Sequence, residues 1–175
     1  MADGVRGSDL SRFHPDIETG IRLHRSIDSF TDRHPIVSDS KDLFRPRHNH
    51  WSAVIVDILY DHFLAARWQR YHESPLDEYV GRFYELLRDN LDLVPDRVRR
   101  FAPLMIQHDW IGSYATRDGI DKILKQMHRR TGLRSDMDTA YLELDEYYEQ
   151  LENQFHSFFA ELQAHAAAKL IELQS

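Results

Sequence analysis

The sequence places a histidine and an aspartate one helical turn apart in residues 15–31. There, Ile17, Ile21 and Ile27 define one face of a helix that advances about 100° per residue. His24 and Asp28 fall within this apolar face, which we expect to be buried. Side chains four residues apart on such a face either ligate one metal ion or form a hydrogen-bonded pair in the core.

A second group of polar side chains interrupts the most apolar segment of the chain, residues 50–70. Asp57 and Asp61 are one turn apart, so their carboxylates project together, whereas His62 points about 100° away. An apolar helix of this kind is expected at the centre of a bundle, where two carboxylates are costly without a cation. The compensating charge is either an arginine or a divalent metal ion.

Together these segments offer a mixed set of imidazole and carboxylate ligands. Such a set suits Mn, Fe or Zn, and its high carboxylate content favours Mn²⁺ or Mg²⁺. A divalent ion lowers the pKa of a bound water and polarises a phosphoryl oxygen. The residues therefore predict metal-dependent phosphoester hydrolysis, with Mn²⁺ as the expected cofactor and Mg²⁺, Fe²⁺ or Zn²⁺ as alternatives.

Helical periodicity covers nearly the whole chain, and runs of alternating β-branched residues are almost absent. We predict an all-α, single-domain bundle over residues 1–175 with about seven helices. Most prolines stand where a helix is expected to begin. The expected helices span residues 15–31, 35–44, 50–70, 75–92, 95–114 with a break around Pro103, 117–130 and 136–171.

The amino-acid composition limits the classes of partner that we expect for the protein. The chain has 22 Lys and Arg against 29 Asp and Glu, a net charge of −7, which argues against nucleic-acid binding. The absence of cysteine excludes a thiolate nucleophile and fits a reducing, cytoplasmic location. No apolar run reaches the ~18 residues of a membrane span, so we expect no membrane association. The oligomeric state is left open.

Four stretches of the sequence resemble the bacterial acyl carrier protein phosphodiesterases: residues 3–7 (DGVRG), 20–28 (GIRLHRSID), 31–32 (TD) and 57–64 (DILYDHFL). A weaker likeness extends over the rest of the chain. The resemblance implies an all-α fold distantly similar to the HD-type metal phosphohydrolases. It also implies an enzyme of fatty acid and lipid metabolism that uses a divalent cation, typically manganese. This enzyme would remove 4′-phosphopantetheine from its partner and substrate, holo acyl carrier protein.

Matched position by position, the resemblance implies a metal centre formed by Asp3, His24, Asp28, Asp61 and His62. Asp57 is expected as a further ligand, or as a residue that orients a ligating imidazole. We expect Asp61 and His62 to act directly in catalysis.

Basic residues near these blocks suggest how an acidic carrier protein would be held. Arg25 is expected to stabilise charge on the phosphoryl oxygens. Arg45 and Arg47 form a local basic cluster and, together with Arg22, would provide a positive docking rim. The alternative for this cluster is an ordinary solvated loop.

Family members usually begin with a further short segment that supplies another histidine, and this sequence lacks it. We keep two other functions open, of which the second follows from this missing segment. One is an HD-like metal phosphohydrolase that acts on a nucleotide or another small phosphoester. The other is a catalytically impaired helical module that only binds a carrier protein.

Overall fold

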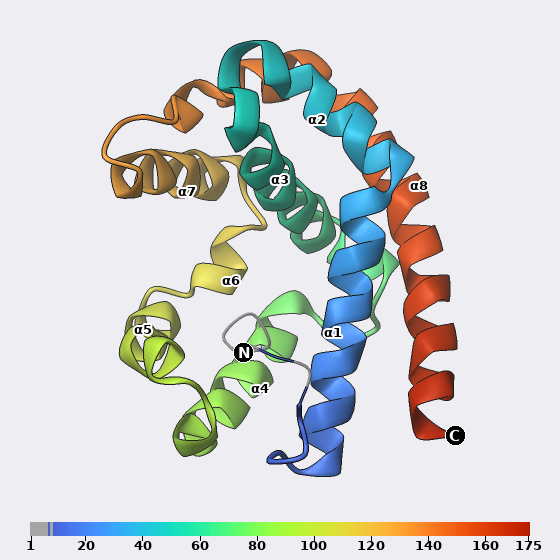
Figure 1. The fold of residues 1–175 in the computed structure, drawn as a ribbon. Coiled ribbons are helices and arrows are strands. Elements are labelled where there is room, and N and C mark those ends of the chain that lie inside the picture. The colour runs from blue at the N-terminus through green and yellow to red at the C-terminus, as the bar shows by residue number, and fades with distance from the viewer. Residues whose placement is uncertain (1–6, 8) are drawn as a thin grey trace.

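The chain folds into helices joined by short loops, and a computed structural model describes residue 7 and residues 9–175 (Figure 1). The α-helices are α1 (Pro15–Arg33), α2 (Pro35–His48), α3 (Ser52–Ala66), α4 (Leu76–Asp89), α5 (Asp96–Gln107), α6 (Trp110–Ser113), α7 (Arg117–Arg130) and α8 (Tyr141–Gln174). Short 3₁₀ helices follow α2, α3 and α4 and precede α8: η2 (Asn49–Trp51), η3 (Trp68–Arg70), η4 (Leu91–Leu93) and η5 (Met137–Thr139). The described residues contain no strand, which confirms the all-α prediction.

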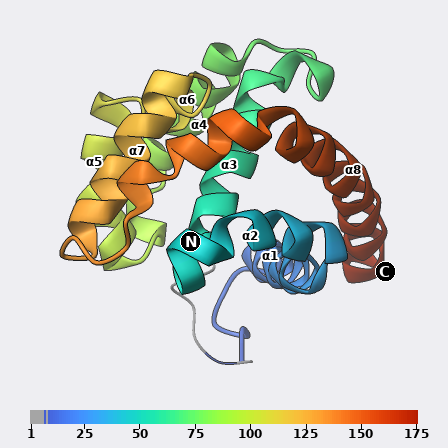
Figure 2. The same cartoon turned by 90° about the horizontal axis from the view of Figure 1, so that it is seen from above.

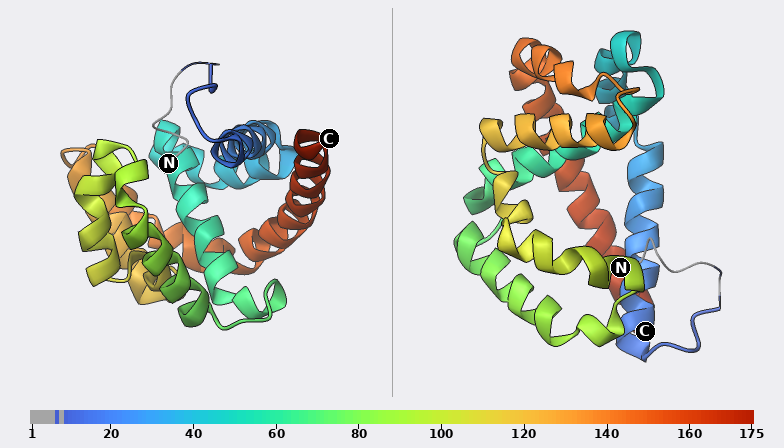
Figure 3. Two further views of the ribbon diagram at one scale, coloured as in Figure 1. Left: turned by 90° about the horizontal axis from the view of Figure 1, so that it is seen from below. Right: turned by 90° about the vertical axis from the view of Figure 1, so that its left-hand side faces the viewer.

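The helix α3 crosses the middle of the molecule. Seen from above, α8 curves around one side, while α4, α5, α6 and α7 lie on the other (Figure 2). The helices α1 and α8 run side by side in opposite directions, and α2 packs against α1, α3 and α8 (Figures 1 and 3). The short helix α6 packs with α4 and α5, and these three form a lobe of their own.

One buried core, formed mainly by α2, α3, α7 and α8, holds these helices together. In α3, the side chains of Ile55, Val56, Leu59 and Phe63 are all 0% exposed. Packing of this density resists any shift of the helix, because core side chains interlock with few voids. The polar residues on the remaining face of α3 are therefore held in fixed positions.

Several helix boundaries differ from the expected ones: α2 runs on to His48 and α3 is shorter than expected, from Ser52 to Ala66. The break expected around Pro103 is wrong, because Pro103 lies inside α5 and the chain turns instead at Asp109. Asp109 has a left-handed backbone (φ 43°), and its carboxylate accepts a hydrogen bond from the Gly112 amide at 3.1 Å. The last long helix begins at Tyr141, and non-helical φ and ψ at Tyr147 mark a kink in it.

None of the helices in the described part of the chain is both long enough and apolar enough to cross a bilayer.

Candidate active site

The helix α1 presents His24 and Asp28 on a surface that is open to solvent. His24 Nδ1 lies 3.1 Å from Asp28 Oδ1, and the two side chains are 35% and 50% exposed. The expectation that this pair is buried is therefore wrong, since Ile21 is the buried residue of α1. The contact still orients the imidazole, because a carboxylate beside Nδ1 favours the proton on that nitrogen.

The helix α3 directs Asp57 and Asp61 to the same side of the molecule. Burial raises the pKa of Asp57; Lys41 of α2 lowers it, and Asp32 and Asp28 of α1 raise it further. Carboxylates from two helices thus lie close enough to repel one another. The helices α1 and α3 both pack against α2. Among the described residues, no three of His24, Asp28, Asp57 and Asp61 place ligand atoms within 4.8 Å of one another.

The Asp61 carboxyl group lies deeper than that of Asp57. Burial raises its pKa to about 7, and the neighbouring Asp57 adds to the rise. Both side chains keep access to solvent, contrary to the expectation of full burial. A carboxyl group that has many protein atoms around it and still contacts solvent is typical of a residue that lines a pocket. Asp61 indeed lines two pockets, of about 760 Å³ and 260 Å³.

His62 does not join this group of carboxylates. Its ring is buried: Nδ1 lies 2.8 Å from the Tyr114 carbonyl oxygen, and Nε2 lies 3.0 Å from the Tyr148 hydroxyl group. The carbonyl can only accept, so Nδ1 donates to it and Nε2 accepts from the tyrosine. Burial also lowers the pKa of His62. The structure therefore makes His62 a hydrogen-bonded core residue, which argues against its expected roles as metal ligand and catalyst.

Arg25 also lies away from Asp61. It lines a separate groove of about 620 Å³ between α1 and α8, together with Arg33 and His165, and it is not part of either pocket at Asp61. This placement does not favour the expected role in stabilising the phosphoryl oxygens.

The three expected docking arginines each form an ion pair. Arg22 pairs with Glu18 at 2.6 Å, Arg45 pairs with Asp42, and Arg47 Nε lies 3.1 Å from a Glu143 oxygen. Each pairing reduces the positive charge that the arginine offers to a partner. The remaining expected ligand, Asp3, lies outside the described residues.

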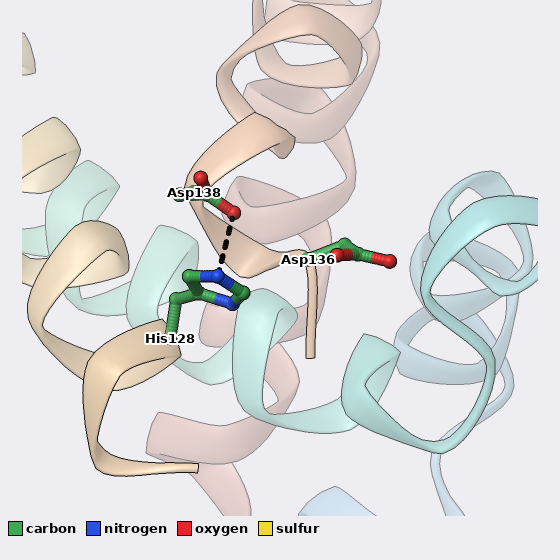
Figure 4. Close-up of side chains that lie close together, drawn as sticks. All are labelled: His128, Asp136 and Asp138. Atoms are coloured by element: carbon green, nitrogen blue, oxygen red, sulfur yellow. Dashed lines mark ion pairs between the residues drawn. The ribbon is translucent and has the colours of Figure 1, made fainter. Parts of the chain in front are cut away.

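A different set of side chains forms the tightest group of potential metal ligands. His128, Asp136 and Asp138 each place one ligand atom within 4.8 Å of the others, the only such group of three found in the described residues (Figure 4). His128 Nε2 lies 3.6 Å from Asp138 Oδ1, and its Nδ1 lies 3.2 Å from the Ser135 hydroxyl group. The sequence offers little signal for this group, because its residues come from the last turn of α7 and from the start of the short helix η5, and no helical periodicity relates the two.

Two charged residues near Asp57 were missing from the expected site. Asp32 stands four residues after Asp28, so helical spacing alone places it on the same face of α1. Lys41 carries no comparable signal, because its approach to Asp57 depends on how α2 packs against α3.

The described part of the chain is all-helical, with His24 and Asp28 on α1 and Asp57 and Asp61 on α3. Comparison with known proteins is more specific. The sequence model of the family described as acyl carrier protein phosphodiesterase matches residues 1–162. The chain therefore belongs to the acyl carrier protein phosphodiesterase family, a family of phosphoric diester hydrolases.

Curated relatives support this assignment. The acyl carrier protein phosphodiesterase of Salmonella agona (strain SL483) is 29% identical over 172 residues, which cover 98% of this chain and 89% of the relative. The protein of the same name from Escherichia coli (strain K12 / DH10B) is 30% identical over 175 residues, with the same coverage. No solved structure gives a significant match.

Proposed function

We propose that the protein is a metal-dependent phosphodiesterase that removes 4′-phosphopantetheine from holo acyl carrier protein. The observation that supports the proposal is electrostatic: Asp57 lies close enough to Asp61 of its own helix and to Asp28 and Asp32 of α1 to interact with them, and Asp61 lines a pocket. We infer the substrate from the family assignment, and we infer the hydrolytic chemistry from the side chains.

The charges around Asp57 fit a divalent cation. Asp28, Asp32 and Asp61 lie near this residue, and Lys41 is the cation that offsets them in part. An uncompensated group of acids raises the pKa of its members, and a bound ion of charge +2 relieves that repulsion. His24, Asp28, Asp57 and Asp61 would hold the ion, with Asp3 as a further ligand on the basis of the resemblance. Their mixture of oxygen and nitrogen atoms favours Mn²⁺, with Mg²⁺, Fe²⁺ or Zn²⁺ as alternatives.

When bound, such an ion makes a water molecule nucleophilic at neutral pH and withdraws charge from a phosphoryl oxygen. The protein's own residues position these groups: Asp28 holds the His24 proton on Nδ1, and the packed core fixes Asp57 and Asp61 on α3. Hydrolysis breaks the bond between phosphorus and the serine oxygen of the carrier. Water gives its hydroxyl to phosphorus and a proton to the serine oxygen.

We propose further that the acidic carrier protein approaches over Arg22, Lys41 and Arg45, which lie on α1 and α2. Positive side chains around a site steer an acidic partner even when the whole chain is negative. The proposal includes neither a nucleic-acid partner nor a membrane, and it places the reaction in the cytoplasm, within fatty acid and lipid metabolism.

A gel-shift assay of holo acyl carrier protein with added Mn²⁺ tests the proposal. We expect the wild-type chain to convert the holo form to the apo form and to release 4′-phosphopantetheine. Asp61→Asn should abolish the conversion, whereas Asp89→Asn, at an exposed position on α4, should not. Tight binding without conversion would instead favour a carrier-binding module, and normal turnover by Asp61→Asn would remove the proposed mechanism.

A further inference from the structure

We infer that the 760 Å³ pocket beside Asp61 binds the pantetheine arm of the substrate. The inference rests on the proposed function and adds to it a binding site for an extended, uncharged chain that carries two amide groups. The volume lies within the range of about 300–1,000 Å³ that is usual for small-molecule sites.

The position of the pocket follows from the residue that it shares with the proposed catalytic centre. Asp61 forms part of its wall, and Asp57, one turn away on α3, faces the acidic side of α1. A phosphodiester bound at Asp61 therefore has the proposed metal ligands on one side and the pocket on the other. Its two ester substituents differ greatly in size. The carrier protein is too large to enter, so the arm is the substituent that occupies the pocket.

The helix α7 provides a continuous wall for such an arm. The wall residues Gly119, Lys122, Ile123, Gln126 and Met127 recur at intervals of three and four, which is one face of a helix. In the part of the chain that the structure describes, the Gln126 side chain has no hydrogen-bond partner and the Lys122 ammonium has no ion-pair partner. These polar groups can therefore bind the arm without breaking a contact in the protein.

The opposite wall is largely apolar. Met105, Trp110, Ile111 and Tyr114 line it from α5 and α6 and from the loop that follows. A pantetheine arm alternates methyl and methylene groups with amides. It therefore needs the apolar wall for its hydrocarbon groups and the polar wall of α7 for its amides. Ligand sites of this kind combine an apolar lining with a few placed polar groups.

Arg130 closes the polar side of the pocket near the reacting group. Its guanidinium lies over the Trp110 ring, 5.7 Å from the centroid. Burial is the main cause that raises the pKa of Tyr114; Asp61 adds to the rise, and Arg130 opposes it. Arg130 and Asp61 thus both act on the same tyrosine. A cation in this position can hold the phosphate that stays attached to the arm after cleavage.

Pocket-filling variants on α7 test the inference. Lys122→Phe and Gln126→Phe introduce a ring into the pocket at positions that are exposed on the helix, so folding should be preserved. Lys125→Phe is the matched control, because Lys125 is an exposed lysine of the same helix that is not part of the pocket wall. We expect the two filling variants to lower kcat/KM for holo acyl carrier protein at least ten-fold, and the control to change it less than two-fold.

Calorimetric titration of the metal-free protein with pantetheine provides a readout that does not depend on turnover. Wild type and Lys125→Phe should bind pantetheine, and both filling variants should bind it at least ten-fold more weakly. Equal kcat/KM in all three variants, or pantetheine binding that is unaffected by the filling, would overturn the inference and leave the phosphodiesterase activity intact. If pantetheine binds in this pocket but the wild-type chain never converts holo carrier protein, the proposed function fails and the pocket assignment stands.

Discussion

Asp61 and His62 are neighbours in the chain, yet their side chains lie on different faces of α3 and have different surroundings. The Asp61 carboxyl group lines two pockets, whereas the His62 ring is buried between the Tyr114 carbonyl and the Tyr148 hydroxyl group. Consecutive residues of a helix point about 100° apart, so one can face a site while the other faces the core. This division of roles gives the first two predictions.

Asp61→Asn should abolish phosphodiesterase activity and stabilise the metal-free fold. The folded protein raises the pKa of Asp61 from 3.8 to about 7, so the folded state holds this proton over a range in which the unfolded state has lost it. The carboxyl group therefore costs the wild type stability progressively as pH rises from 4 to 7, and fully above pH 7. Urea unfolding in EDTA at several pH values should show that the free energy of unfolding of the variant increases relative to that of the wild type between pH 4 and pH 7. A constant difference across pH would contradict the prediction, and Asp89→Asn should show no such trend.

His62→Phe should act on stability rather than on metal binding. The substitution leaves the Tyr114 carbonyl and the Tyr148 hydroxyl group without their partner, at a cost of about 1–3 kcal/mol in the free energy of unfolding. Chemical unfolding followed by circular dichroism measures that loss, and His50→Phe, at an exposed position, should be nearly neutral. If the His62→Phe protein had normal stability but no longer bound Mn²⁺, the result would contradict this prediction and indicate that His62 is a metal ligand.

Mn²⁺ should raise the melting temperature of the wild-type protein, and EDTA should reverse the effect. A ligand present at 100 times its Kd stabilises the folded state by about 2.7 kcal/mol, provided that it does not bind the unfolded chain. Asp57→Asn should lose most of this stabilisation, because it removes a proposed ligand. Asp138→Asn, in the other group of potential ligands, should keep it. The reverse pattern would place the ion at His128, Asp136 and Asp138.

Arg45→Glu should raise KM for holo acyl carrier protein about five-fold at low ionic strength and leave kcat unchanged. The ion pair with Asp42 already offsets part of the Arg45 charge, so the effect should be smaller than for an isolated arginine. Added salt should shrink it further, since exposed charges are screened. Arg88→Glu, at an exposed position of α4, serves as the control. A fall in kcat rather than a rise in KM would argue against a docking role.

The sequence by itself determined the helical fold and the family. Apolar residues at three- and four-residue spacing fix which face of each helix must be buried, whatever its neighbours are. The same spacing paired His24 with Asp28 and Asp57 with Asp61, and it would have added Asp32 to that face. Helix starts were also readable, since Pro15 and Pro35 each occupy the first turn of a helix.

Only the tertiary structure decided which of these polar groups share a space. Helical spacing says which way a side chain points, but not what stands opposite it, because that depends on how separate helices pack. Packing brought Lys41 near Asp57, turned His62 towards α8, and paired Arg47 of α2 with Glu143 of α8. It also opened the pocket at Asp61, whose walls come from α3, α5, α6 and α7. A pocket between four helices cannot be predicted from local sequence patterns, because each helix contributes only a few residues of one face to it.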